Sequence, residues 1–401
     1  MTYNFGTTNF ADTQLDAFNR LRVSSPLTLF EGKFHYGLGI DGDGLWTQTT
    51  ATGGTLTFLN NESAINLAVT TTSGSLARMR TQEYFSYHTG KGQLIMMTGV
   101  FGVAQANTVK RVGYFDDNDG LYFIQNGVTG FGVAKRSSVS GSNVETIVYQ
   151  SAWNLDPMDG TGPSGLTMNV ANTEIYSIDF QWLGVGSATF TVEIDGQPYQ
   201  VHRFDHSNKT TQVYMKSGSL PVTYEIFNTG TAASAAALKQ ICSSVMSEGA
   251  EDPSGESYAI GDTSTTSCPT GAWTPIVTLR VPTTFNGQTV RGKDIVKSIH
   301  VINTTGNQSG AWALIRNATL GNTTYVNVAN TLSFTQYDLN ANTVANGTFK
   351  MQGYAPISSA ENIDAPTEIL DVYPGDTLTI ACRGITGACV MAAAINWREI
   401  K

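Results

Sequence analysis

Two carboxylates lie two positions apart at the end of a predicted β-hairpin. Glu193 stands near the end of an alternating run over 187–194, and Asp195 opens an Asp-Gly turn into a second run over 197–204. Alternation with period two is typical of a strand with one buried face. Asp-Gly favours a tight hairpin turn because both residues accept positive φ. We therefore predict an antiparallel hairpin with these carboxylates at its tip.

The spacing of acidic residues decides whether this hairpin is catalytic. The fragment Glu193-Ile194-Asp195 resembles the catalytic strand of some sandwich-fold sugar hydrolases. Retaining glycosidases need two carboxyl groups about 5 Å apart. The next alternate position holds Gln197, beyond the turn, so the second catalytic carboxylate is missing. The sequence favours a structural hairpin over a glycoside hydrolase, and we expect no catalytic residues and no enzyme.

The histidines and the acidic run are wrongly spaced for a metal ion. His202 and His206 share a strand face, but they lie about 13 Å apart on an extended chain. This distance is too long for both side chains to bind one metal ion. The acidic run over 116–120 would need Phe115 as the first ligand of a calcium loop, so a hairpin loop is favoured. The four cysteines form no Cys-x-x-Cys pair. We predict no metal site and no cofactor.

The loop over 156–165 and two tryptophans are candidates for contacts with other molecules. Asp156 and Asp159 lie in this acidic, glycine-rich loop, for which contact with a neighbouring protein is favoured over a calcium or sugar site. Trp153 and Trp182 have the ring type that stacks on sugars, although a 10% aromatic content indicates that most rings belong to a core. A host glycan is therefore an alternative partner.

Composition indicates an all-β protein that binds neither nucleic acid nor membrane. Only 14% of the 401 residues are charged, and glycine is abundant at 41 positions. A net charge of -9 argues against nucleic-acid binding, because that function needs clustered Lys and Arg to neutralise phosphates. The chain has neither an apolar run of about 20 residues nor a signal-peptide pattern, so we expect folding in a cytoplasm. Cys382 and Cys389 either pair across a hairpin or stay reduced, and reduced thiols are favoured.

Turn and strand signals divide the chain into four parts. Residues 1–30 form an arm, and 31–249 carry the strand rhythm of a large jelly-roll or lectin-like antiparallel β-sandwich. Residues 250–270 have the polar composition of a linker. Residues 271–401 carry a second strand pattern that suits a smaller sandwich. The stretch 232–246 is compatible with a helix or a closing strand, and the strand is favoured.

The arm has a short helical pattern. Residues 12–21 place three apolar side chains on one face after a possible Asp cap, and those side chains are Leu15, Phe18 and Leu21. A helix this short is unstable alone, so it must dock on its own body, on a sister subunit or on another protein.

The arm also carries a family resemblance. Residues 16–30 read Asp-Ala-Phe-Asn-Arg-Leu-Arg-Val-Ser-Ser-Pro-Leu-Thr-Leu-Phe, which resembles the arm motif of structural proteins from tailed bacteriophages. Asn19 stands where that pattern usually has Gly, a mild change because Asn tolerates positive φ. Further stretches that resemble such virion proteins are 90–95, 153–156, 159–162 and 241–249.

This resemblance implies a virion protein that is assembled in the host cytoplasm. It implies a non-enzymatic accessory or appendage subunit on the exterior of the capsid or tail, bound to other virion proteins and self-associating, with a trimer among the options. The arm would bury an apolar face and pair its cations with carboxylates of a neighbour, using Leu15, Phe18, Leu21, Arg20 and Arg22. The first alternative is a tail module that binds a receptor or glycan, and the second is a glycoside hydrolase.

Overall fold

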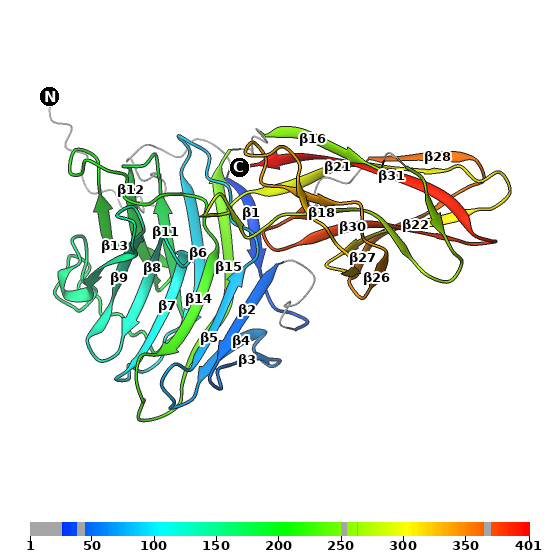
Figure 1. The fold of residues 1–401 in the computed structure, drawn as a ribbon. Coiled ribbons are helices and arrows are strands. Elements are labelled where there is room, and N and C mark those ends of the chain that lie inside the picture. The colour runs from blue at the N-terminus through cyan, green and yellow to red at the C-terminus, as the bar shows by residue number, and fades with distance from the viewer. Residues whose placement is uncertain (1–25, 38–44, 250–254, 263, 365–369) are drawn as a thin grey trace. The chain divides into compact units, whose positions relative to one another are not determined.

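The computed structural model describes residues 26–37, 45–249, 255–262, 264–364 and 370–401, and these form two compact β units (Figure 1). Unit 1, coloured blue to green, holds the described residues 26–37, 45–81 and 87–249. Unit 2 holds 82–86 and the described residues from 255 onward, coloured yellow-green to red. The sheets are antiparallel, so the predicted all-β sandwich class is confirmed.

Two stacked sheets make up unit 1 (Figure 1). In spatial order, the described strands of the first sheet are β13 (Gln197–Asp205), β12 (Ser187–Ile194), β11 (Glu174–Phe180), β6 (Gln93–Val100), β15 (Ala236–Glu248), β4 (Ala64–Val69) and β3 (Thr55–Leu59), with β1 (Pro26–Gly32) beside β15. Those of the second sheet are β10 (Val144–Tyr149), β9 (Gly130–Ser137), β8 (Gly120–Asn126), β7 (Thr108–Phe115), β14 (Val222–Asn228), β5 (Leu76–Thr81) and β2 (Trp46–Ala51). A 3-10 turn, η2 (Gln150–Ala152), follows β10.

Unit 2 is built from two further sheets and two short ribbons. The first sheet is β16 (Glu256–Gly261), β31 (Cys389–Ile400), β21 (Lys293–Asn303) and β28 (Ser359–Asp364), with β17 (Thr266–Cys268) on β31 and β29 (Asp371–Val372) on β21. The second is β24 (Val326–Asn327), β25 (Gln336–Asp338), β18 (Thr274–Arg280), β30 (Thr377–Gly384), β22 (Gly310–Arg316) and β27 (Thr348–Ala355). The ribbons are β19 (Thr284–Phe285) with β20 (Gln288–Thr289), and β23 (Thr319–Gly321) with β26 (Thr343–Ala345).

Aromatic rings from both sheets fill the core of unit 1. Phe123 on β8 packs against Tyr176 on β11 and Phe190 on β12, with ring centroids 4.8 and 5.2 Å apart. All three side chains are fully buried because they sit on the inward positions of alternating strands. Burial of each ring contributes about 1.5–3 kcal/mol relative to exposure. The strands are therefore held rigidly enough to position the side chains on the outer faces.

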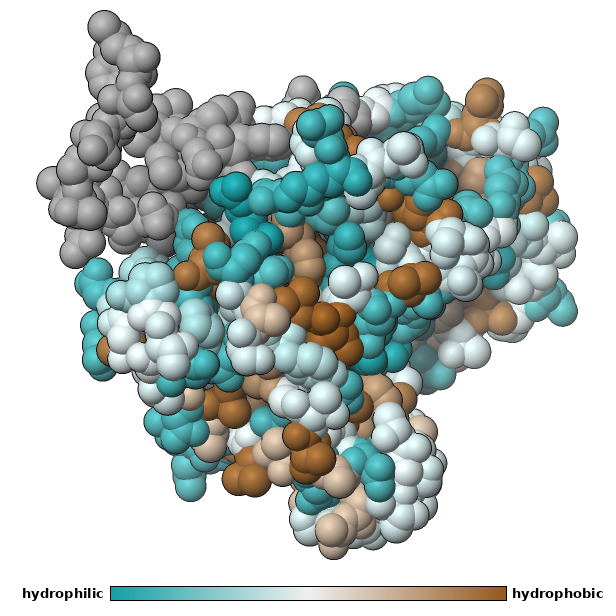
Figure 2. Space-filling model, turned by 90° about the vertical axis from the view of Figure 1, so that its left-hand side faces the viewer, coloured by the Kyte–Doolittle hydropathy of each residue, from teal (hydrophilic) through white to brown (hydrophobic). Residues whose placement is uncertain are grey.

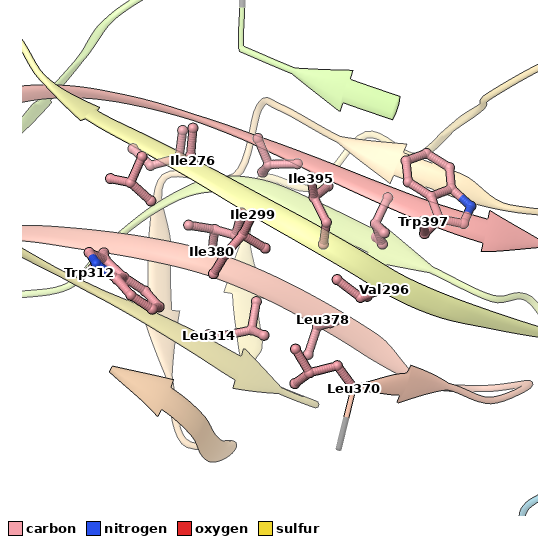
Figure 3. Close-up of a cluster of buried hydrophobic side chains, with 14 of the residues drawn as sticks. Ile276, Val296, Ile299, Trp312, Leu314, Leu370, Leu378, Ile380, Ile395 and Trp397 are labelled. Atoms are coloured by element: carbon pink, nitrogen blue, oxygen red, sulfur yellow. The ribbon is translucent and has the colours of Figure 1, made fainter. Parts of the chain in front are cut away.

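The core of unit 2 follows the same rule with mostly aliphatic side chains (Figure 3). Trp312 and Ile380 come from the sheet of β22 and β30, and Ile299, Ile395 and Trp397 come from the sheet of β21 and β31. These side chains point toward one another between the two layers. Three of the cysteines, Cys268, Cys382 and Cys389, are buried free thiols, and Cys242 is an exposed one.

The structure corrects two predicted segments. Pro26–Gly32 is strand β1 and pairs with β15, so the end of the predicted arm belongs to the sandwich. The prediction of a linker over 250–270 is wrong for strands β16 and β17, because both pair with β31 and belong to a sheet of unit 2. The stretch around 236–248 is strand β15, as favoured. The helical pattern over 12–21 lies outside the described residues. In the described ranges, no helix is long and apolar enough to cross a membrane.

Candidate functional sites

The predicted hairpin is confirmed, and it does not present a catalytic pair. Asp195 and Gly196 have φ values of 52° and 73°, as the turn between β12 and β13 requires. Glu193 is half-buried opposite Pro198, whereas Asp195 is exposed in the turn. Gln197 opens β13. Strand β12 ends at Ile194, before a second acidic side chain could follow on the same strand.

The two histidines are structural. His206 is buried, stacks on Tyr214 with ring centroids 3.9 Å apart, and bonds through Nδ1 to the Gly186 carbonyl at 2.7 Å. The Nδ1 of His202 accepts the Asn154 amide at 3.3 Å. Burial lowers the pKa of both imidazoles to about 4, so both are neutral at pH 7. Within the described ranges, no three His, Cys, Asp or Glu are placed to hold a metal ion.

The carboxylates of the 156–165 loop bind the loop itself. Asp156 is buried, and its two oxygens accept the amides of Met158 at 2.9 Å and Ser164 at 2.8 Å. Asp159 is exposed and accepts both the amide and the hydroxyl of Thr161, bonds that hold its pKa below the usual range. Asp159 is therefore the exposed carboxylate of this loop, whereas Asp156 shapes the loop.

The two candidate tryptophans are engaged within unit 1. Trp153 is 6% exposed, and its Nε1 donates to the Val148 carbonyl at 3.1 Å. Trp182 is half-buried, donates to the Met215 carbonyl at 3.0 Å, and meets Tyr87 edge-on. A sugar ring needs an open aromatic face, so Trp153 is unsuited to the predicted stacking. In the view of Figure 2, hydrophobic residues lie in small groups among polar ones.

A charged network that sequence reasoning missed occupies the outer face of the second sheet of unit 1. It spans β5, β7, β9, β10 and β14 and the loop after β7. We call it the arginine cluster, and its members are Arg78, Arg80, Arg111, Arg136, Asp117, Glu145 and Glu225. Four cations face three anions, a net charge of +1 in a chain of net charge -9.

Glu225 is the buried centre of the arginine cluster. Its side chain is 2% exposed, and Oε1 accepts Arg111 Nη1 at 2.8 Å. Oε2 accepts Arg78 Nε at 2.5 Å. Burial raises the pKa of Glu225, but the charges of Arg78 and Arg111 outweigh it and hold that pKa below its usual range. Glu225 is therefore ionised at neutral pH.

The other two acids are committed in the same way. Glu145 accepts Arg111 Nη2 at 2.9 Å and Arg136 Nη2 at 3.1 Å, and it also accepts the hydroxyl of Tyr122. Asp117 is more exposed and pairs with Arg78 and Arg80, each at 3.0 Å. Despite the opposing effect of burial, the arginines hold the pKa of both carboxyls low. A carboxylate held in this way is a poor proton acceptor at neutral pH.

Glu174 is a carboxyl whose pKa is raised to about 7. It begins β11, opposite Gly99, and partial burial is the cause of the raised pKa. Acid catalysis on sugars needs a second carboxyl at a set distance. The described residues provide Glu174 with no hydrogen-bonded or ion-paired acid. The sequence carried no signal for this shift, because burial by residues distant in the chain causes it.

Comparison with known proteins identifies no family. No protein-family model matches the sequence, and no curated protein matches it. Among solved structures, a protein of unknown function from Shewanella oneidensis is 9% identical, with a TM-score of 0.35, 59% of this chain covered and 91% of the other. A family 16 glycosyl hydrolase from Mycobacterium smegmatis is 13% identical, with a TM-score of 0.36, 55% of this chain covered and 100% of the other. Peanut lectin is 10% identical, with a TM-score of 0.33 and coverages of 56% and 98%. These values carry no conclusion about activity or ligand.

Proposed function

We propose that this chain is a non-enzymatic structural protein of a tailed-bacteriophage virion. It is an accessory or appendage subunit on the exterior of the capsid or tail, docks through its N-terminal arm and self-associates. The resemblance of residues 16–30 to the phage arm motif supports the virion assignment. Two units whose described residues form antiparallel β-sheets suit a durable external subunit.

The observation that carries the non-enzymatic part is the pairing within the arginine cluster. Each of its three acids accepts hydrogen bonds or ion pairs from two arginines, so the broad outer face of that sheet is neutralised internally. Glu193 and Asp195 sit at a hairpin tip without a partner carboxylate. Neither place offers the acid and base that hydrolysis of a glycosidic bond needs.

Removal of the arm tests the docking role. Strand β1 begins at Pro26, so deletion of residues 1–25 leaves every described strand intact. We expect the truncated protein to keep its melting temperature and to be lost from particles when it is co-expressed with the other virion proteins. Full-length protein with Leu15, Phe18 and Leu21 changed to alanine should also be lost, whereas Thr7→Ala should be incorporated. Normal incorporation of the truncated protein would overturn the proposal.

Glycan binding is the second candidate, and an exposed ring in unit 2 favours it. Tyr354 is 75% exposed on β27 and lies opposite Ala311. Arg383 lies on the other side of Ala311, with its guanidinium 4.7 Å from the ring centre of Trp273. Flat rings beside a guanidinium suit an anionic sugar. A glycan array probed with the full chain, with Tyr354→Ala and with the control Tyr36→Ala tests glycan binding. Loss of binding in Tyr354→Ala alone supports this candidate function. Absence of binding by the full chain refutes it.

A further inference from the structure

Two fully buried carboxyl groups face each other at one end of unit 2. Asp294 on β21 is the register partner of Glu399 on β31, and both are 0% exposed. The hydroxyl of Thr335 lies between them. Its Oγ1 is 2.9 and 2.8 Å from the two oxygens of Asp294 and 2.8 Å from Oε2 of Glu399. Three oxygens thus surround one hydroxyl hydrogen.

Hydrogen-bond counting calls for a second proton shared between Asp294 and Glu399, because one hydroxyl hydrogen cannot serve both carboxyl groups. Glu399 Oε2 already accepts the Ser333 hydroxyl at 2.5 Å and the Thr335 amide at 3.3 Å, so it acts as an acceptor. If the Thr335 hydroxyl donates to Glu399, its contact with Asp294 joins two oxygens, and one must carry a proton. A proton on one carboxyl oxygen of Asp294 lets that oxygen donate to Thr335 Oγ1 while the Thr335 hydroxyl donates to Glu399.

The charges around Asp294 agree with this assignment. Burial is the main cause that raises its pKa well above the usual range; the Thr335 hydrogen bond opposes this rise, and the negative charges of Glu399 and Asp371 add to it. The Tyr258 hydroxyl donates to Glu256 at 2.6 Å, and the charges of Glu399 and Asp294 add to the rise in the pKa of Tyr258. Of the two nearby lysines, Lys293 pairs with Glu83 and Asp371, each at 2.8 Å, and Lys401 lies 3.5 Å from Oε1 of Glu399, the other acid of the pair. Within the described ranges, no cation pairs with Asp294.

The pair fastens one loop of unit 2. Residues 328–335 form this loop, which is closed by a 3.0 Å bond from the Val328 amide to the Thr335 carbonyl. Ser333 and Thr335 attach it to Glu399, and Lys401 Nζ donates to the Leu332 carbonyl at 2.5 Å. The fastening keeps Phe334, 6% exposed, within the core cluster.

We propose that Asp294, Glu399 and Thr335 form a proton-held latch that fixes the 328–335 loop when one proton is bound. Opening of the loop exposes Asp294 to water, where it ionises and gives its proton to solvent. Because the closed form holds the proton more tightly than the open form, opening is suppressed in acid. Above the ordinary Asp pKa of about 3.9, opening becomes easier by about tenfold per pH unit, until the closed form also ionises. Acidification thus favours the closed form of the 328–335 loop, and the latch controls how often Phe334 is exposed.

Hydrogen exchange on the full chain tests the latch. Between pH 5 and pH 7, protection of peptides covering 328–336 should fall about a hundredfold, after correction for the intrinsic exchange rate. Asp294→Asn keeps the shape and the donor but cannot ionise, so its protection should be independent of pH. The matched control Asp364→Asn alters an exposed acid of the same unit and should follow the wild type. Equal pH dependence in wild type and Asp294→Asn, or none in the wild type, would overturn the proposal.

A second measurement needs no variant. Infrared spectra of protein labelled with carbon-13 at aspartate carboxyls should contain the band of a protonated carboxylic acid at pH 7. Absence of that band would overturn the proposal even if Asp294→Asn failed to fold. Its presence in Asp364→Asn and loss in a folded Asp294→Asn would assign the proton to Asp294.

Discussion

Replacement of Glu225 by glutamine should destabilise unit 1 strongly. Glutamine keeps the shape of the side chain but removes the charge that neutralises Arg78 and Arg111, whose side chains are 21% and 13% exposed. Removal of one partner from a buried ion pair costs about 3–5 kcal/mol, because the remaining charge stays desolvated. Both arginines keep a second acid, Asp117 and Glu145 respectively, so we expect about 3 kcal/mol, near the lower bound.

The pH dependence gives this prediction a second signature. The pKa of Glu225 is lower in the folded chain than in the unfolded chain, so its stabilising effect is present above the ordinary Glu pKa of about 4.3. The effect is lost as the pH falls through the lowered folded value, where the carboxylate takes up a proton. The wild type and Glu225→Gln should therefore differ most at neutral pH and converge in acid.

Hydrogen exchange with urea resolves the two units. Peptides from β5, β7 and β14 report the free energy of opening unit 1, and peptides from β30 and β31 report unit 2. We expect the loss only in the first set. The control Glu193→Gln makes the same chemical change on a half-buried acid of unit 1 and should stay within about 0.5 kcal/mol of wild type. A loss below about 1 kcal/mol in Glu225→Gln, or one that matches the control, would refute the role given to this ion pair.

Two further substitutions test close packing and edge protection. Gly353→Ala would place a Cβ 2.5 Å from the Trp312 ring, so it should destabilise unit 2 by about 1–3 kcal/mol. In the control Gly306→Ala, the new Cβ meets nothing within 4 Å, so unit 2 should keep its stability. Equal melting curves for the two variants would contradict the predicted clash. The Asn154 side chain bonds both the amide and the carbonyl of Arg203, each at 2.9 Å, on edge strand β13. Asn154→Ala should lose about 1–3 kcal/mol and aggregate faster by light scattering than the exposed-turn control Asn61→Ala, since it frees a strand edge. Unchanged scattering would show that the edge is protected by other means.

Local patterns in the sequence were sufficient for most strands of unit 1. The hairpin around Asp195-Gly196, with runs over 187–194 and 197–204, was predicted with nearly its observed bounds, because alternation and turn chemistry act between near neighbours. The linker prediction failed at Glu256–Gly261 for the opposite reason. That polar segment becomes strand β16 only because β31, more than a hundred residues later, supplies its partner.

The candidate sites show the same division. Trp153 and Asp156 had side-chain types suited to contact, but the fold buries both. The arginine cluster had a weak local signal, since Arg78 and Arg80 alternate with buried Ala77 and Met79 on one strand. Nothing local indicated that Glu225, 147 positions from Arg78, would meet it.

The sequence by itself determined the all-β class, the turn positions and the alternation that separates buried from outward side chains. These depend on backbone preference and on hydrophobic period, which are properties of short segments. Tertiary structure decided which charged side chains pair and which carboxyl groups have shifted pKa values. The pKa of Glu225 is lowered between two arginines and the pKa of Asp294 is raised by burial beside Glu399, because pairing and desolvation depend on neighbours that the fold brings together.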